Sequence, residues 1–156
     1  MLAFSRHHPD AATAEIDDVL GRTRRPVGAT LLALFASPGL VDVVAERLPV
    51  IEMFWAAPDV AFVREGVIVG WQVGDADEAK AAVDVGCAYV IAQGVEAGGH
   101  VRGTTPLNDL LPRVRDAVDV PIVAAGGIGP GQVRENVARR RLTGCALGRG
   151  IGLEDR

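Results

Sequence analysis

The sequence predicts an α/β fold that forms part of a (β/α)8 barrel, with a parallel sheet and flanking helices. Short runs rich in Val, Ile and Leu recur along the chain, and amphipathic segments separate them at a strand-to-strand spacing of roughly 20 to 30 residues. The runs are continuously apolar, which is typical of strands that are covered on both faces. Helical connections between such strands make them parallel.

The apolar runs predict strands over residues 27–34, 50–54, 67–71, 88–92, 121–125 and 144–147. Helices are expected between them, over residues 11–24, 38–47, 58–64, 76–85, 107–118 and 131–140. Asp75 suits the amino cap of the helix at 76–85, and Gly86 suits its carboxyl end. Pro106 and Pro112 frame the next helix. A closed barrel has eight strands and about 250 residues, so six strands correspond to most of one barrel.

Composition narrows the class of protein. The 156 residues are 49% apolar and carry a formal net charge of -4, which indicates one domain over residues 1–156, with residues 1–10 poorly ordered. The sequence has no basic stripe with interleaved aromatic residues, so we do not expect a nucleic-acid partner. Cys87 and Cys145 are far apart and lack a histidine at metal-ligand spacing, so we expect free thiols in a reducing compartment and no metal site. The absence of a run approaching ~20 apolar residues and of a signal-peptide pattern favours a cytoplasmic protein without a membrane span.

One stretch, residues 93–103, stands out as a candidate site. It follows the apolar run 88–92, so its polar groups fall at the carboxyl end of a strand, where α/β proteins place their chemistry. Gly98, Gly99 and Gly103 allow the backbone to approach a ligand closely. His100 lies among them, and histidine readily exchanges a proton near neutral pH. We expect Glu96 to be a hydrogen-bonding member of this loop rather than a catalytic acid.

Three segments resemble the nitronate monooxygenase family, also called 2-nitropropane dioxygenases. They are residues 70–73, reading Gly-Trp-Gln-Val, residues 92–100, reading Ala-Gln-Gly-Val-Glu-Ala-Gly-Gly-His, and residues 121–128, reading Pro-Ile-Val-Ala-Ala-Gly-Gly-Ile. Together with Pro-Val-Gly at residues 26–28, their order resembles strands three to eight of that family's TIM barrel, over nearly the whole chain. The resemblance implies a flavoprotein, an FMN-dependent oxidoreductase that oxidises alkyl nitronates with dioxygen.

The resemblance also implies roles for single residues. His100 matches the family's base near the nitronate, and the flavin then accepts the electron. Gln72, Gln93 and Gly98 match positions that line or contact the flavin. Gly126 and Gly127 match the family's phosphate site, and backbone amides that follow a strand and open a helix bind anions favourably. Gly148 also matches a phosphate-site glycine, although under the frameshift hypothesis below this match is an accident of codons. Alternatively, Gly126, Gly127 and Gly129 serve only as a tight turn, and His100 is an exposed loop histidine.

The chain departs from the family pattern in three places. The family's opening strands, with their Pro-Met flavin loop, have no counterpart, which suggests an amino-terminal truncation. Thr30 stands where the family has a flavin-contacting Asn. The carboxyl-terminal segment 141–156 is atypical: permitted codons for residues 142–150, read one nucleotide upstream, encode Ala-Asp-Gly-Val-Arg-Val-Gly-Thr-Arg, which is close to the family's final strand. We hypothesise a frameshift after about residue 139, which the nucleotide sequence tests.

Two other functions stay open at this stage. A flavin-dependent enoyl reductase shares the Glu-Ala-Gly-Gly-His motif. A non-catalytic remnant would act, if at all, by pairing its exposed strand edges with another copy in a homo-oligomer.

Overall fold

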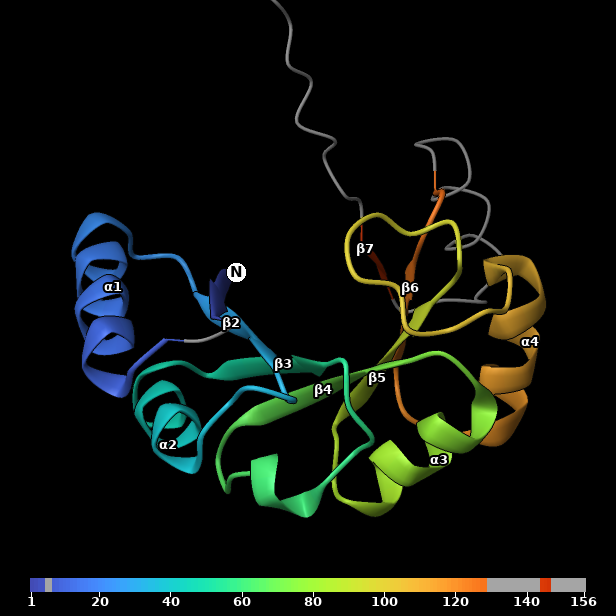
Figure 1. Ribbon diagram of the computed structural model, residues 1–156, viewed down its shortest axis with the longest axis horizontal. Coiled ribbons are helices and arrows are strands. Elements are labelled where there is room, and N and C mark those ends of the chain that lie inside the picture. Colours follow the sequence, from blue (N-terminus) through green and yellow to red (C-terminus); the bar gives the residue numbers. More distant parts are fainter. Residues whose placement is uncertain (5–6, 129–143, 147–156) are drawn as a thin grey trace, which may run out of the picture.

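The computed structural model describes residues 1–4, 7–128 and 144–146. Parallel strands form one curved sheet in chain order, and the helices cover its outer side (Figure 1). The strands are β1 (Leu2–Phe4), β2 (Gly28–Leu32), β3 (Val50–Phe54), β4 (Ile68–Val73), β5 (Tyr89–Gln93), β6 (Ile122–Ala125) and β7 (Gly144–Ala146). This arrangement confirms the predicted α/β fold, a partial (β/α)8 barrel.

The helices are α1 (Pro9–Arg22), α2 (Pro38–Arg47), α3 (Ala76–Asp84) and α4 (Leu107–Ala117), with one 3-10 turn, η1, over Val60–Phe62. Asp75 caps α3 as predicted, because its Oδ1 accepts from the amide of Glu78 at 2.8 Å. Gly86 follows the same helix with a φ of 99°, a left-handed conformation that glycine adopts without strain. Both boundaries therefore follow from local sequence signals.

Three expectations about single elements are wrong. Residues 2–4 form strand β1 rather than a poorly ordered start, because they pair with β2 and Phe4 is 1% exposed. The segment 58–64 forms only the turn η1, since Asp59 caps it and the chain reaches Gly66 at a φ of 78° soon after. Pro112 lies inside α4 instead of framing it, at an exposed position where the proline ring supplies no N–H to the helix. The helix expected at 131–140 lies outside the described residues.

The two faces of the sheet differ in character. The outer face is apolar and is fully covered by the helices: Ile51, Met53, Val69, Trp71 and Val90 are at most 1% exposed. The inner, concave face carries polar residues at alternate positions, because successive side chains in a strand point to opposite sides. In β3, burial alternates accordingly. The continuous apolar runs predicted strands covered on both faces. That prediction fits the outer face, whereas the inner face carries polar residues at alternate positions.

The concave face becomes the floor of the candidate site.

Within the described residues, no helix combines the length and the apolar character that a membrane crossing requires.

Candidate functional site

A cavity of about 280 Å³ lies on the concave side, towards the carboxyl ends of the central strands. Its lining comes from strands β2 to β5 and from the loop after β5, and consists of Thr30, Glu52, Met53, Phe54, Gln72, Ile91, Gln93, Gly98, Gly99 and His100. Four of the residues predicted from the sequence, Gln72, Gln93, Gly98 and His100, are therefore brought together around one space.

The floor of the cavity is a row of hydrogen-bonded side chains across four strands. Thr30, Glu52, Gly70 and Tyr89 are successive partners in the strand register. The Glu52 carboxylate accepts from the Thr30 hydroxyl at 3.3 Å and from the Tyr89 hydroxyl at 3.0 Å. Burial and, next, the negative charge of Glu52 and its hydrogen bond raise the pKa of Tyr89, which therefore stays a donor.

Gly70 makes this row possible. A Cβ at Gly70 would overlap the ring of Tyr89, so the absence of a side chain lets that ring lie across β4 and reach Glu52 on β3. Neither Glu52 nor Tyr89 was identified as a site residue from the sequence. The available signal was a glutamate within an otherwise apolar strand, but its partners are 22 and 37 residues away in the chain.

The loop that carries His100 is tied to the sheet by Gln93. This side chain is 4% exposed, its Nε2 donates to the carbonyl of His100 at 3.1 Å, and its Oε1 accepts from the amide of Arg102 at 3.3 Å. A primary amide offers both a donor and an acceptor, so one side chain fixes the backbone on both sides of Val101. Gln93 thus positions the loop as well as lining the cavity.

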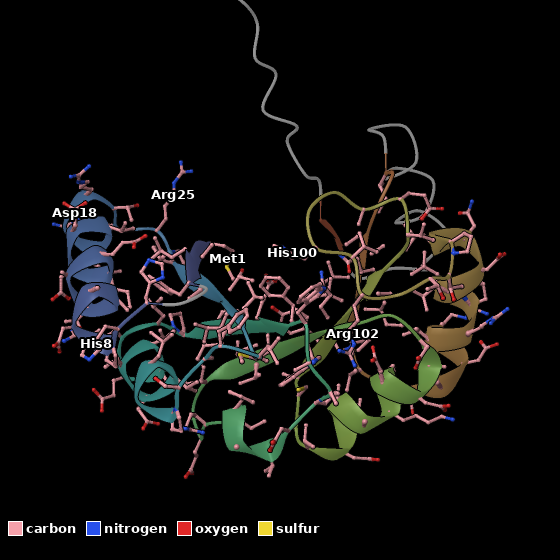
Figure 2. The ribbon with its side chains drawn as sticks, viewed as in Figure 1. Met1, His8, Asp18, Arg25, His100 and Arg102 are labelled. Atoms are coloured by element: carbon pink, nitrogen blue, oxygen red, sulfur yellow. The ribbon has the colours of Figure 1, made fainter. Side chains whose placement is uncertain are left out.

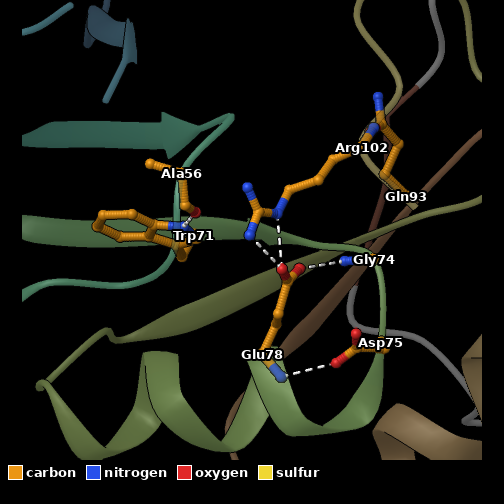
Figure 3. Close-up of polar contacts among 7 residues, drawn as sticks. All are labelled: Ala56, Trp71, Gly74, Asp75, Glu78, Gln93 and Arg102. Atoms are coloured by element: carbon orange, nitrogen blue, oxygen red, sulfur yellow. Dashed lines mark hydrogen bonds and ion pairs between the residues drawn. The ribbon is translucent and has the colours of Figure 1, made fainter. Parts of the chain in front are cut away.

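A second tie links the same loop to the start of α3. Arg102 binds the Glu78 carboxylate through Nε and Nη2, both at 2.6 Å, while the other carboxylate oxygen accepts from the amide of Gly74 at 2.9 Å (Figure 3). The backbones of Gly74 and Gly103 also meet, since a Cβ at Gly74 would lie 2.6 Å from the Gly103 Cα. We term the contacts among Arg102, Glu78 and Gly74 the Arg102–Glu78 latch.

Glu96 acts within the loop, as the sequence indicates. Its carboxylate accepts from the amide of Leu107 at 3.0 Å, which is the first residue of α4. No side chain of the preceding residue, Pro106, caps that helix, so Glu96 supplies both the acceptor and a favourable negative charge at the helix amino end. This residue therefore stabilises the loop and the helix start.

His100 lies on the concave side of the sheet and is exposed (Figure 2). Its imidazole contacts the ring of Trp55 edge to face, with the centroids 4.9 Å apart and the planes at 73°. Trp55 has a φ of 69°, which is strained for a bulky residue, and its Nε1 is buried without a partner. Trp55 was not identified from the sequence, where its only signal is an aromatic residue immediately after a strand.

The glycines predicted for the phosphate site lie apart from the cavity lining. Gly126 and Gly127 have φ values of 123° and 59°, and a Cβ on them would lie 3.0 Å from the Ala97 amide and the Glu96 Cβ respectively. They thus form a turn packed against the His100 loop, where only glycine fits without strain. Gly148 lies outside the described residues.

Gln72 adds an unpaired hydrogen-bond acceptor to the site, and the described residues offer neither a metal site nor a reactive thiol. The Oε1 atom of Gln72 is buried without a partner, a state that costs about 1–3 kcal/mol and that a ligand donor would relieve. In the part of the chain that the structure describes, no group of three His, Cys, Asp or Glu side chains could hold a metal ion. Burial raises the pKa of the Cys87 thiol to about 11, so this cysteine is not a nucleophile near neutral pH.

Known proteins with similar sequences and folds place this arrangement in a family. The sequence model of nitronate monooxygenases matches residues 39–139. A Rhodococcus jostii protein named (3aS,4S,5R,7aS)-5-hydroxy-7a-methyl-1-oxo-octahydro-1H-indene-4-carboxyl-CoA dehydrogenase is 32% identical over 143 residues, which are 86% of this chain and 40% of that protein.

Two solved structures are also similar. Nitroalkane oxidase from Streptomyces ansochromogenes has a TM-score of 0.82 and 28% identity, covering 94% of this chain and 56% of its own. FabK from Thermotoga maritima has a TM-score of 0.78 and 28% identity, covering 89% and 46%. The chain spans about half the length of these proteins or less than half. Because the family model covers most of the chain and both structures share its fold, the chain belongs to the nitronate monooxygenase family.

Proposed function

We propose that this chain provides the FMN-binding and proton-accepting part of an oxidoreductase that oxidises alkyl nitronates with dioxygen. The observation that carries the proposal is the position of His100, which lines the same cavity as Gln72, Gln93 and Gly98. Membership of the nitronate monooxygenase family and the fold shared with a nitroalkane oxidase support it. When bound, FMN would supply the electron acceptor that reacts with dioxygen.

The cavity has features that suit a planar cofactor. Its volume of about 280 Å³ is just below the usual range of ligand pockets, about 300–1,000 Å³, so it would take a ring system with the phosphate outside it. Gln72 presents an unpaired buried acceptor to a ring N–H. Gly98 has open space on its side-chain side, so a ring could approach its backbone. We assign the phosphate to the amides of Gly126 and Gly127.

His100 would take the α-proton of the nitroalkane, the conjugate acid of the nitronate, so that the nitronate forms at the cavity. The hydrogen bond from Gln93 fixes its carbonyl, and the edge-to-face contact with Trp55 fixes its ring. These two contacts hold the imidazole at the cavity while its exposure lets it return the proton to water. Positioning of this kind is the first requirement of a general base.

Titration with FMN, followed by its absorbance and fluorescence, tests the cofactor assignment. Gly98→Ala is the informative variant: no atom lies within 4 Å of a Cβ there and its φ is not positive, so the fold is unaffected while the methyl group enters the cavity and weakens FMN binding. Gly21→Ala, on the outer helix α1 with equally open space, is the matched control and keeps wild-type affinity. Equal FMN affinity in both variants would show that FMN does not bind in this cavity.

Oxidation of an alkyl nitronate tests the reaction. In the FMN-loaded protein with the neutral nitroalkane as substrate, His100→Gln is expected to lower kcat by about 10²–10⁴, the usual contribution of a general base, because the preformed nitronate has already lost its acidic α-proton. FMN binding should persist, because His100 is held through its backbone carbonyl rather than its ring. An unchanged kcat would leave His100 as a loop residue only.

The similarity to FabK favours a second candidate, a flavin-dependent enoyl reductase. An assay of NADH-dependent enoyl reduction beside nitronate oxidation separates the two, since activity in only the first excludes nitronate as substrate. Absence of FMN binding at high micromolar concentration would instead support a non-catalytic chain.

A further inference from the structure

Glu52 gives the cavity an electrostatic character that the flavin proposal does not use. It is the only acidic side chain among the described lining residues, and none of those residues is Lys or Arg. Side chains from both sides of β3 orient it: Thr30 on the adjacent strand β2 donates to one carboxylate oxygen, and Tyr89 on β5 donates to the other by reaching across Gly70 on β4. A carboxylate held from both sides is preorganised for a ligand, because little conformational freedom remains to be lost.

The orienting hydrogen bonds leave capacity for a ligand. A carboxylate offers about four acceptor sites, and the two side-chain hydroxyl groups occupy two of them. Gln72 adds its unpaired Oε1 to the same cavity. It lies two residues beyond Gly70, the register partner of Glu52, and so on the same face of the sheet. The described floor therefore presents acceptors and negative charge.

We propose that Glu52 anchors a cation subsite, which binds an amidinium or ammonium group of a ligand that enters the cavity. A positively charged N–H donor satisfies the free acceptor sites of the carboxylate and gains charge-assisted hydrogen bonds. An anionic group of the same shape placed against Glu52 meets the carboxylate charge, and no Lys or Arg among the described lining residues offsets it, whereas the nitronate of the proposed reaction would lie against His100. The subsite shares its cavity with the proposed FMN site, but it does not require bound flavin.

Benzamidinium and benzoate are suitable probes because they have nearly the same planar shape and opposite charges. Isothermal titration of the full chain without flavin measures both. We expect benzamidinium to bind in the low millimolar range or tighter and benzoate not to bind. Glu52→Gln keeps the shape of the side chain and should weaken benzamidinium about tenfold or more, because hydrogen bonds to charged groups are the stronger ones. Glu46→Gln removes an equal charge from an exposed position of α2 and should leave the affinity unchanged.

Tyr89→Phe provides a second variant in case Glu52→Gln does not fold. It keeps the ring over Gly70 and removes only the hydroxyl that orients Glu52, so a severalfold loss of benzamidinium affinity is expected with the far-UV circular dichroism unchanged. The proposal is overturned if wild-type protein does not bind benzamidinium, if it binds benzoate equally well, or if Glu52→Gln and Glu46→Gln bind alike. A separate FMN titration that shows no flavin binding would refute the cofactor proposal and leave the benzamidinium result standing.

Discussion

The Arg102–Glu78 latch should contribute measurably to the stability of the His100 loop. Its side chains are 32% and 19% exposed, and both Nε and Nη2 of Arg102 contact one oxygen of Glu78. Exposed ion pairs contribute about 0.2–1 kcal/mol, so this half-buried pair with two contacts belongs near the upper end, at about 1 kcal/mol. The second oxygen of Glu78 accepts from the buried Gly74 amide, and loss of that acceptor costs about 1–3 kcal/mol more.

These magnitudes distinguish two substitutions at one position. Glu78→Gln keeps an acceptor for Gly74 and should lower the free energy of unfolding by about 1 kcal/mol. Glu78→Ala loses both contacts and should lower it by about 2–4 kcal/mol. Urea unfolding of Glu78→Gln, Arg102→Met and the double variant gives the coupling energy, which we expect at about 1 kcal/mol and smaller in high salt.

The loop itself supplies a local measurement. The Arg102 amide donates to Gln93, so in Glu78→Gln its hydrogen exchange should accelerate about fivefold, the factor that corresponds to 1 kcal/mol. The exposed pair Arg22 and Asp18 on α1 is the control, with an expected coupling of about 0.3–0.5 kcal/mol. A coupling at the latch no larger than at this control, with unchanged exchange at Arg102, would refute the reasoning.

Three further predictions concern buried contacts. Gly70→Ala should displace the Tyr89 ring and lower the free energy of unfolding by about 1–3 kcal/mol in urea unfolding, and wild-type stability would show that the ring does not need this space. Gly103→Ala should cost a similar amount, because its Cβ would lie 2.8 Å from the Gly74 Cα, whereas the openly placed Gly98→Ala should stay within about 0.5 kcal/mol of wild type. Cys87 has a pKa of about 11 when folded against 9.0 for the free thiol, so between these values the unfolded chain loses its proton first and stability falls as pH rises, by up to about 1.4 kcal/mol per pH unit. Unfolding free energies from pH 8 to 11 should therefore fall less steeply in Cys87→Ala, and identical slopes would contradict the assignment.

Local patterns were sufficient for helices α1 to α4, for most strands and for the position of the His100 loop, but not for the segment 58–64, which forms only the turn η1. Asp75 and Gly86 mark the ends of α3 because caps and left-handed glycines act over a few residues. The three-residue strand β1 escaped detection, since Leu2 and Phe4 become a strand only by pairing with β2. Sequence reasoning also placed His100, Gln93 and Gln72 at strand ends that a parallel sheet brings to one edge, and the cavity contains all three.

The amino-acid sequence by itself determined the fold class, the family and a glycine-rich loop with a histidine at the end of a strand. These features depend on residue type and on spacing over short stretches of chain. Only the tertiary structure decided that Glu52 lies between Thr30 and Tyr89, that Trp55 contacts His100, and that Arg102 reaches Glu78. Such contacts depend on the register of neighbouring strands and on the path of the loops, which bring together residues 22 to 45 positions apart.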